Sequence, residues 1–215
     1  GLPWASDVSG GEATSCVRRA VDTVTPVACW GANDHGQIGS GNTGDPVALP
    51  ASPVWTFGVP ERVELGGTTS CAWGGQATSP VCWGANNLGQ AGLTPMGGDV
   101  TTPQAWLTGI GKSGSLQLGP AHGCAITGGG TVQCWGSNAT LQLGNTGLNA
   151  SVTPLAVGAI ANAKLVAVGS GHSCALVWDT KSDAKVLCWG SNSVGQVEPK
   201  AAGAAPQAAP KPVAN

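Results

Sequence analysis

Short apolar or alternating runs, separated by glycine-rich turns, follow one another along most of the chain. The clearest pair is residues 124–127 and 131–134, two β-prone runs joined by the three glycines 128–130. Two such runs around a glycine turn indicate a β-hairpin. A further apolar run ending at glycine precedes this pair, and an extended segment after proline, 153–157, follows it. The pattern therefore predicts units of four short strands.

The tripeptide Cys-Trp-Gly gives these units a common period. Its four copies are 53, 52 and 54 residues apart and begin at Cys29, Cys82, Cys134 and Cys188. Four short antiparallel strands that repeat at about 50 residues are typical of a propeller blade, because each small sheet can bury its faces only against its neighbours. We predict an all-β fold, a β-propeller or propeller arc of four blades, each a four-stranded antiparallel sheet.

The predicted repeats cover about 4–54, 55–106, 107–160 and 161–197, followed by an Ala/Pro-rich tail, 198–215. The composition of the tail is typical of a disordered linker. However, Pro210 lies 21 residues after Trp189, close to the spacing between the tryptophan and the outer segment in earlier units. Both a disordered tail and a tail that ends in the outer strand of the last blade stay open.

All eight cysteines fall into four local pairs, one in each unit. Structural zinc sites usually have Cys-x₂₋₄-Cys spacing, which is absent here, so we expect one hairpin disulfide per blade. Such bridges persist in oxidising compartments, which predicts a secreted, cell-surface or periplasmic protein. Because the one methionine is Met96, we also expect that an initiator residue and an export signal have been removed. The predicted bridges join Cys16 to Cys29, Cys71 to Cys82, Cys124 to Cys134 and Cys174 to Cys188.

Tryptophans divide into a repeated and a non-repeated set. The repeated ones should lie between adjacent blades, where a large apolar ring buries the most area; they are Trp30, Trp83, Trp135 and Trp189. Three others, Trp55, Trp106 and Trp178, lie in long loops or near a hairpin tip. Exposed aromatics there would anchor a partner or a glycan. Local packing is the alternative.

The segment Cys-Trp-Gly-Ala-Asn-x-x-Gly-Gln-x-Gly resembles the repeat of the RCC1 family, in which Trp-Gly-x-Asn-x-x-Gly-Gln-Leu-Gly marks each blade. His172-Ser173 is similar to the family's His-Ser/Thr step, whereas Leu141 and Glu198 replace glycines of the repeat. The resemblance implies a β-propeller, usually of seven blades, and the paired cysteines suit exported bacterial-type members. Four blades would leave two apolar end sheets, for which we expect a partner, further copies of the chain or missing repeats.

Charge and motifs exclude several classes of function. Only 9% of residues are charged and the net charge is −2, which argues against nucleic-acid binding. No apolar stretch approaches the roughly 20 residues of a membrane span. The chain has no nucleophile-elbow, zinc-protease, phosphate-loop or calcium-loop motif, so we predict no catalytic, cofactor or metal site. We interpret His122 and His172, at the same repeat position, as structural, with a ligand pair as the alternative, and His35 as a surface residue.

These observations predict a non-enzymatic extracellular binding or assembly module, such as the globular subunit of a surface structure or filament. Its partner would be a protein or further copies of itself. The alternative is a secreted propeller that binds or inhibits another protein, as an enzyme inhibitor or a glycan-binding module. Recognition is expected from the variable loops 41–55, 92–106 and 144–152. In the last of these, Asn149 matches a glycosylation acceptor, whereas Asn138, which matches too, should instead tie its turn.

Overall fold

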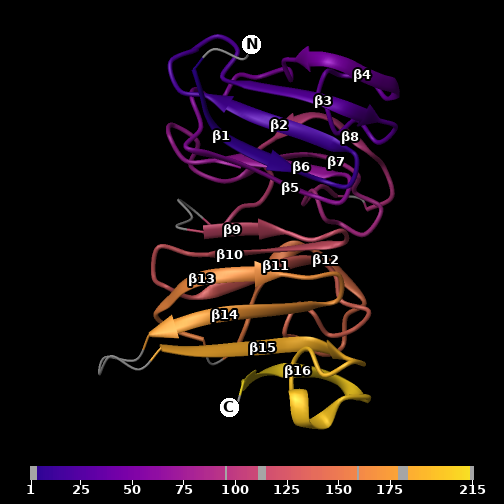
Figure 1. Cartoon of the computed structure of the whole chain (residues 1–215), viewed down its shortest axis with the longest axis vertical. Coiled ribbons are helices and arrows are strands. Elements are labelled where there is room, and N and C mark those ends of the chain that lie inside the picture. The colour runs from indigo at the N-terminus through magenta and orange to yellow at the C-terminus, as the bar shows by residue number, and fades with distance from the viewer. Residues whose placement is uncertain (1–3, 95, 111–114, 159, 179–183, 214–215) are drawn as a thin grey trace.

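The computed structural model describes residues 4–94, 96–110, 115–158, 160–178 and 184–213. In these ranges the strands form four antiparallel sheets of four strands each (Figure 1). Blade 1 contains β1 (Ala5–Gly10), β2 (Thr14–Arg19), β3 (Val27–Asn33) and β4 (Gly44–Ala51). Blade 2 contains β5 (Arg62–Gly66), β6 (Thr69–Trp73), β7 (Val81–Gly84) and β8 (Val100–Gln104). Blade 3 contains β9 (Ser115–Leu118), β10 (His122–Ile126), β11 (Val132–Ser137) and β12 (Ala150–Ala156). Blade 4 contains β13 (Ala163–Val168), β14 (His172–Trp178), β15 (Ala184–Asn192) and β16 (Ala204–Pro212).

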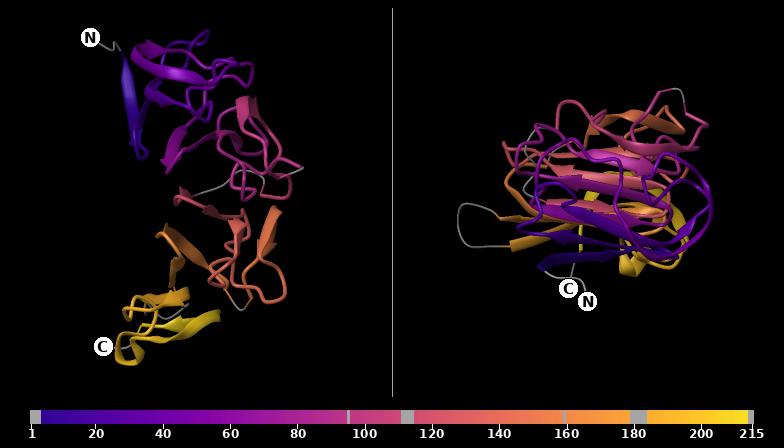
Figure 2. Two further views of the ribbon diagram at one scale, coloured as in Figure 1. Left: turned by 90° about the vertical axis from the view of Figure 1, so that its right-hand side faces the viewer. Right: turned by 90° about the horizontal axis from the view of Figure 1, so that it is seen from above.

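The strands of every blade pair in chain order, and the blades follow one another along a C-shaped arc (Figure 2). The first strand of each blade contacts the first strand of the next, so β1, β5, β9 and β13 line the inner side of the arc. The predicted all-β propeller arc of four blades is confirmed. Within the described ranges, no helix is long and apolar enough to cross a membrane.

The Ala/Pro-rich tail contains an outer strand. β16 pairs with β15, with Gln207 opposite Gly190 and Lys211 opposite Cys188, and the short 3-10 helix η1 (Pro199–Ala201) precedes it. Proline removes a backbone donor and is tolerated at the edge of a sheet, so Pro206, Pro210 and Pro212 suit this outermost position. Residues 214 and 215 of the tail lie outside the described part.

One disulfide joins the second and third strands of each blade, which confirms the predicted hairpin bridges. In each blade the two cysteines are directly opposite in the strand register, with Cα atoms 4.1 Å apart. The bridges are Cys16–Cys29, Cys71–Cys82, Cys124–Cys134 and Cys174–Cys188. Each therefore closes a short local loop and adds no link between blades.

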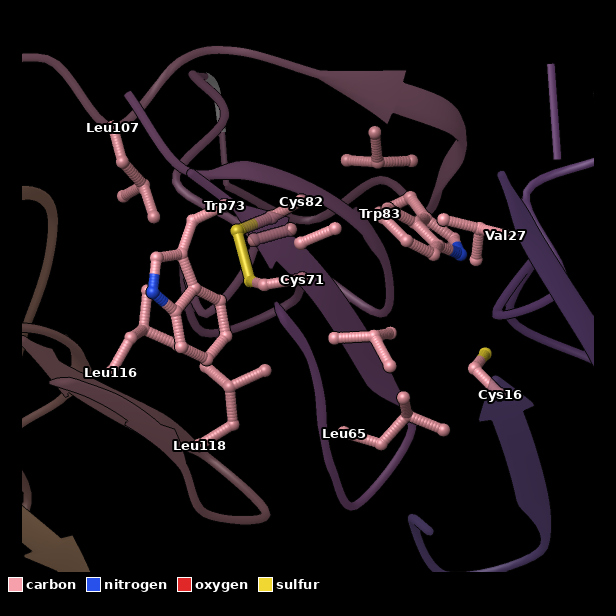
Figure 3. Packing of buried hydrophobic residues seen from close by; sticks show 14 of the residues in the cluster. Cys16, Val27, Leu65, Cys71, Trp73, Cys82, Trp83, Leu107, Leu116 and Leu118 are labelled. Carbon is pink, nitrogen blue, oxygen red and sulfur yellow. A yellow bond between two sulfur atoms is a disulfide. The ribbon is translucent and has the colours of Figure 1, made fainter. Parts of the chain in front are cut away.

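The core lies between the blades. In Figure 3 the Cys71–Cys82 bridge occupies the middle of blade 2, with Trp73 on one side, against Leu116 and Leu118 of β9. Trp83 lies on the other side, toward Val27 of blade 1. Side chains alternate between the two faces of a strand, so each blade contributes one apolar set to the blade before it and another to the blade after it.

The glycine of Cys-Trp-Gly is required by a close approach of two backbones. All four copies have φ near +100°, and each lies at a register shift between the third and fourth strands. A Cβ on Gly31 would lie 2.3 Å from the carbonyl oxygen of Ala13, and a Cβ on Gly84 would lie 2.3 Å from that of Thr68. No side chain fits there, so the repeat needs glycine.

Candidate protein-binding interface

We call the interface between two neighbouring blades a seam. The same hydrogen bond joins the two blades at all three seams. The indole Nε1 of the repeated tryptophan donates to a backbone carbonyl oxygen in the preceding blade, and the ring itself is fully buried. This bond satisfies the polar end of a large apolar side chain. The pairs are Trp83 with Gln37 at 2.8 Å, Trp135 with Gln90 at 2.9 Å and Trp189 with Gln142 at 2.9 Å.

The accepting glutamine lies in a turn that two side chains hold in shape. In blade 1, the Asn33 side-chain oxygen accepts from the Ile38 N–H at 3.1 Å, and the Gln37 side-chain oxygen accepts from the His35 N–H at 2.8 Å. The same two bonds recur in the other blades, around Asn86 and Gln90, Asn138 and Gln142, and Asn192 and Gln196. Every blade, including the last, therefore presents a glutamine carbonyl on the same kind of turn.

A serine adds a second donor at two of the seams. Ser70 Oγ donates to the Gln37 carbonyl at 3.1 Å, and Ser173 Oγ donates to the Gln142 carbonyl at 3.0 Å. In blade 3 the equivalent residue is Gly123, where a Cβ would lie 2.6 Å from the Trp135 ring. Sequence reasoning missed Ser70, although a serine before the first cysteine in three of the four units was a visible signal.

The first blade carries the donor half of this seam, and no other described blade packs against it on that side. Ser15 is directly opposite Trp30 in the register, as Ser70 is opposite Trp83. Within the described part of the chain, neither Ser15 Oγ nor Trp30 Nε1 has a hydrogen-bond partner, and both residues are half-buried. Val8 is 70% exposed, whereas its equivalents in blades 2 to 4 are 2%, 1% and 6% exposed, namely Val63, Leu116 and Val166. We call Val8, Ser15 and Trp30 the N-terminal face.

The fourth blade carries the acceptor half. Gln196 is half-buried, whereas its equivalents in the earlier blades are buried, and no described residue donates to its backbone carbonyl. Val186 is 43% exposed, whereas Val27 and Val132 at the same position are fully buried. Leu176 is half-buried and Trp178 is exposed on the same side of the sheet as the Cys174–Cys188 bridge. We call Leu176, Trp178, Val186 and Gln196 the C-terminal face.

His122 lies inside the seam between blades 3 and 4. Its Nε2 is 2.8 Å from Ser173 Oγ. Burial lowers the pKa of His122 to about 4, with a smaller contribution from His172, so the ring is neutral. A serine beside a histidine is the arrangement of an activated nucleophile. Here, however, Ser173 is fully buried and its hydroxyl donates to Gln142, so the pair is inaccessible to a substrate and joins two blades.

His172, at the same repeat position, is less enclosed. It lines a shallow hollow between the rim turns of blades 3 and 4, together with Thr140 and Ser193. Partial burial lowers the pKa of His172 below its usual 6.5. No cluster of three histidine, cysteine or acidic side chains that could hold a metal ion occurs among the described residues.

His35 links the turn after β3 of blade 1 to the loop before β8 of blade 2. Its Nδ1 lies 3.2 Å from the Asp99 carboxylate of the loop before β8, and its Nε2 lies 3.7 Å from Asp34. The backbone N–H of Gly41 also donates to the Thr101 carbonyl at 2.9 Å. The rim loops of blades 1 and 2, which we predicted to be variable recognition loops, are therefore tied to each other.

A small polar groove lies along the inner strands. Arg62 lies 3.6 Å from the Asp7 carboxylate, which also accepts from the Val63 N–H at 2.9 Å. Burial and, to a smaller extent, the charge of Asp7 together raise the pKa of Glu64 to about 7, while a hydrogen bond from the Leu118 N–H opposes both effects. The Glu64 carboxyl therefore holds its proton to a higher pH than an exposed glutamate does.

The three non-repeated tryptophans that we predicted as interface candidates have different surroundings. Trp55 packs edge-on against Phe57 and Trp83, and its Nε1 donates to the Gly58 carbonyl, so it belongs to the core of the first seam. Trp106 is exposed and its Nε1 donates to the Gln104 side chain at 2.9 Å. Trp178 is exposed on the C-terminal face. An interface role for Trp106 and Trp178 stays a prediction.

The asparagine that matches both the repeat and the glycosylation pattern ties its turn. The Asn138 amide donates to the carbonyl oxygens of Asn145 and Leu148 at 2.9 and 2.8 Å, and the residue is buried. Asn149 is exposed next to it. Glycosylation at Asn149 stays a prediction.

This geometry defines an RCC1-like β-propeller arc. Two family models described as "Regulator of chromosome condensation (RCC1) repeat" match residues 115–140 and 129–176. The chain is 32% identical over 180 residues to "Probable E3 ubiquitin-protein ligase HERC6" of Homo sapiens and 27% identical over 181 residues to "Ultraviolet-B receptor UVR8" of Arabidopsis thaliana. These alignments cover 80% and 83% of this chain but only 17% and 40% of the relatives. The matches support the RCC1-like repeat family.

Solved structures show the same fold. Human WBSCR16 superposes with a TM-score of 0.83 over 98% of this chain and 55% of that chain. Yeast RCC1 (Prp20), in a crystal structure with Kap60 bound, superposes with a TM-score of 0.77 over 98% of this chain and 49% of that chain. Sequence identity is 18% in both, so these likenesses concern the fold alone. The chain spans about half the length of these propellers.

Proposed function

We propose that the chain is an exported, non-enzymatic module that binds protein through the two end faces of its arc. The observation that carries the proposal is that each end presents half of an interface whose other half occurs three times inside the chain. Apolar positions that are buried at every internal seam are exposed at the ends, and a contiguous exposed apolar surface is typical of an interaction site. The yeast RCC1 propeller, bound to Kap60, supports protein binding as a use of this fold.

Export is argued from the four bridges. Disulfides that staple every blade would be reduced in most cytosols, and they are typical of extracellular proteins. The binding or assembly role in a surface structure rests on this location together with the exposed end faces. The ligase activity in the name of HERC6 is not transferred, because the match covers 17% of that protein.

Two measurements test the proposal. Alkylation of the chain recovered from its native source, followed by mass spectrometry, should find no free thiol among the eight cysteines; free thiols would contradict export. Immobilised wild-type protein should capture a protein from the extracellular fraction of the producing organism. The double variant Val8→Asp/Val186→Asp should lose that capture, whereas Leu49→Asp, at an exposed position of β4, should retain it. Equal capture by all three proteins would contradict binding through the end faces.

A further inference from the structure

We infer that the seam between blades 3 and 4 is an acid-sensitive joint, which opens when His122 is protonated. Among the described residues, this is the one seam in which an ionisable side chain is hydrogen-bonded to a donor of the glutamine carbonyl. The joint lies inside the arc, so it is independent of what the two end faces bind and of the proposed function.

His122 belongs to the hydrogen-bond network that holds this seam closed. Ser173 Oγ and Trp189 Nε1 both donate to the Gln142 carbonyl, at 3.0 and 2.9 Å. His122 Nε2 lies 2.8 Å from the same Ser173 Oγ. A hydroxyl has one proton to donate. Because Ser173 gives that proton to Gln142, its bond with the histidine needs a proton on Nε2, and this bond joins blade 3 to blade 4.

The second nitrogen of the imidazole has no partner. His122 is fully buried, and no described residue forms a hydrogen bond with its Nδ1. A neutral imidazole tolerates this arrangement, since Nδ1 then carries only a lone pair. The imidazolium has an N–H at both nitrogens, and the second N–H would be a buried, charged donor without an acceptor. The closed seam therefore accepts the neutral form of His122 and disfavours the cation.

The strands around His122 offer no carboxylate that could compensate the positive charge. Strands β9, β11 and β13 pack against β10, and β14 lies across the seam. Apart from bridged cysteines, the ionisable side chains on these strands are Lys164, exposed on β13, and His172 on β14, and the turn 138–142 has none. Burial and, to a smaller extent, the charge of His172 lower the pKa of His122 to about 4.

Opening the seam would let water solvate the charged ring. The hollow between the rim turns of blades 3 and 4 is lined by Ala121, the neighbour of His122 in the sequence, so solvent already lies close to the ring. In the open seam the pKa of His122 returns toward 6.5, so the open form binds the proton more tightly. The stabilising contribution of the neutral ring is complete above pH 6.5 and is lost as the pH falls to 4. The opening equilibrium should rise by up to about tenfold per pH unit in this range, on the order of 10²-fold in total.

The other two seams have threonine at the position of the buried histidine. Thr14 Oγ1 donates to the Ala32 carbonyl at 2.9 Å, and Thr69 Oγ1 donates to the Ala85 carbonyl at 3.0 Å. Both bonds lie within one blade, and a threonine does not titrate. Threonine is therefore the replacement for His122 that the repeat itself provides.

Exchange of the indole N–H protons, followed by solution NMR, measures each seam separately. Each internal seam contains one buried indole, Trp83, Trp135 or Trp189, whose N–H is protected while its seam is closed. Between pH 6.5 and 4, the protection of Trp189 relative to N-acetyl-tryptophanamide should fall on the order of 10²-fold. Trp83 is the internal control, and its protection should change little. Circular dichroism at both pH values should show that the blades stay folded.

Two variants assign the change to the histidine. His122→Thr should make the protection of Trp189 insensitive to pH in this range. Thr14→His places an imidazole beside Ser70, which is the equivalent of Ser173, and should make the protection of Trp83 acid-sensitive.

Other outcomes would overturn the inference. An equal loss of protection at Trp83, Trp135 and Trp189 would show that acid unfolds the whole chain rather than one seam. Unchanged protection of Trp189 would show that the closed seam holds the imidazolium. The wild-type chain decides both of these points, even where a variant does not fold. A folded His122→Thr variant that keeps the acid response would assign it to another group.

Discussion

Leu141 has a left-handed backbone conformation at a position where the other repeats have glycine. Its φ is +62°, and the equivalent glycines Gly36, Gly89 and Gly195 have φ of +72°, +80° and +84°. A residue with a Cβ is strained in this region. The turn adopts it because the bonds around Asn138 and Gln142, which are the same in every blade, determine its shape.

Replacing Leu141 by glycine should therefore stabilise the protein. Relief of the left-handed strain exceeds the added backbone entropy of the unfolded chain, and we expect a gain of about 1 kcal/mol in the free energy of unfolding. Urea denaturation measures it. The reverse change in blade 4, Gly195→Leu, should cost a similar amount, and a destabilised Leu141→Gly would contradict the strain at this turn.

Glu64 and His122 make opposite contributions to the pH dependence of stability. The pKa of Glu64 is raised from 4.5 to about 7 in the folded chain, so its stabilising contribution is complete below pH 4.5 and is lost as the pH rises to 7. The pKa of His122 is lowered from 6.5 to about 4, so its contribution is complete above pH 6.5 and is lost as the pH falls to 4. Between about pH 4.5 and 6.5 the two effects oppose each other.

Single substitutions should uncover each effect. In Glu64→Gln the free energy of unfolding should rise between pH 4.5 and 6.5, whereas in His122→Gln it should fall over the same range. Each change should be on the order of 1–2 kcal/mol, after allowance for solvent screening at the partly exposed Glu64. Urea denaturation of both variants across this range measures the slopes. If the free energy of unfolding changes with pH in the same direction in both variants, at least one of the two groups titrates normally in the folded chain.

At the scale of the structural elements, one seam bond recurs between blades whose sequences otherwise differ. It joins an indole on the third strand of a blade to a rim turn of the preceding blade, and the partners are 45 to 47 residues apart in the chain. The bond combines a large buried area with a satisfied polar group. This explains why the tryptophan and the Asn-x-x-Gly-Gln turn occur together in the repeat.

Trp135→Phe should therefore cost more than Trp30→Phe in the isolated chain. The first substitution leaves the buried Gln90 carbonyl without its donor and creates a cavity, which should lower the free energy of unfolding by about 2–4 kcal/mol. The indole of Trp30 has no acceptor within the described chain and is half-buried, so its loss should cost less than about 1 kcal/mol in the monomer. Thermal unfolding at a concentration below association compares the two, and equal losses would argue against the seam bond.

For the molecule as a whole, stability is distributed among local units. The bridged cysteines are 10 to 14 residues apart in sequence. A loop of that size gains roughly 2–3 kcal/mol from a disulfide on the chain-entropy model. Four bridges together are comparable with the total stability of an ordinary domain, roughly 5–15 kcal/mol. Each bridge reinforces its own blade, whatever the contacts between blades contribute.

Reduction of all four bridges should therefore unfold the isolated chain. We expect the β-sheet circular dichroism signal to disappear in strong reductant at 37 °C and to return on reoxidation. Thiol titration confirms that all eight cysteines are reduced when the signal is measured. A reduced chain that keeps its spectrum and melting temperature would show that the seams alone are sufficient.

The parts of the fold that depend on neighbours in sequence were determined by the sequence itself. Hairpins, their four bridges and the four-strand unit follow from spacings of a few residues, such as Cys124 to Cys134, and from a repeat of Cys-Trp-Gly. Leu141 was visible as a departure from the repeat, although its strained backbone was not. The composition of the tail suggested disorder as readily as a strand, because the pairing of β16 depends on the exposed edge of β15.

Only the tertiary structure decided which equivalent residues are buried. Val8 and Val63 occupy the same place in their repeats, yet one is exposed and the other is buried, because among the described residues a blade packs against the second and none packs against the first. Likewise His122 loses its charge in a complete seam, and Trp30 is left without the acceptor that Trp83 has. Cys-Trp-Gly specifies one blade through local spacing, whereas burial, pKa and free hydrogen-bonding groups depend on the adjacent blade, which no single repeat encodes.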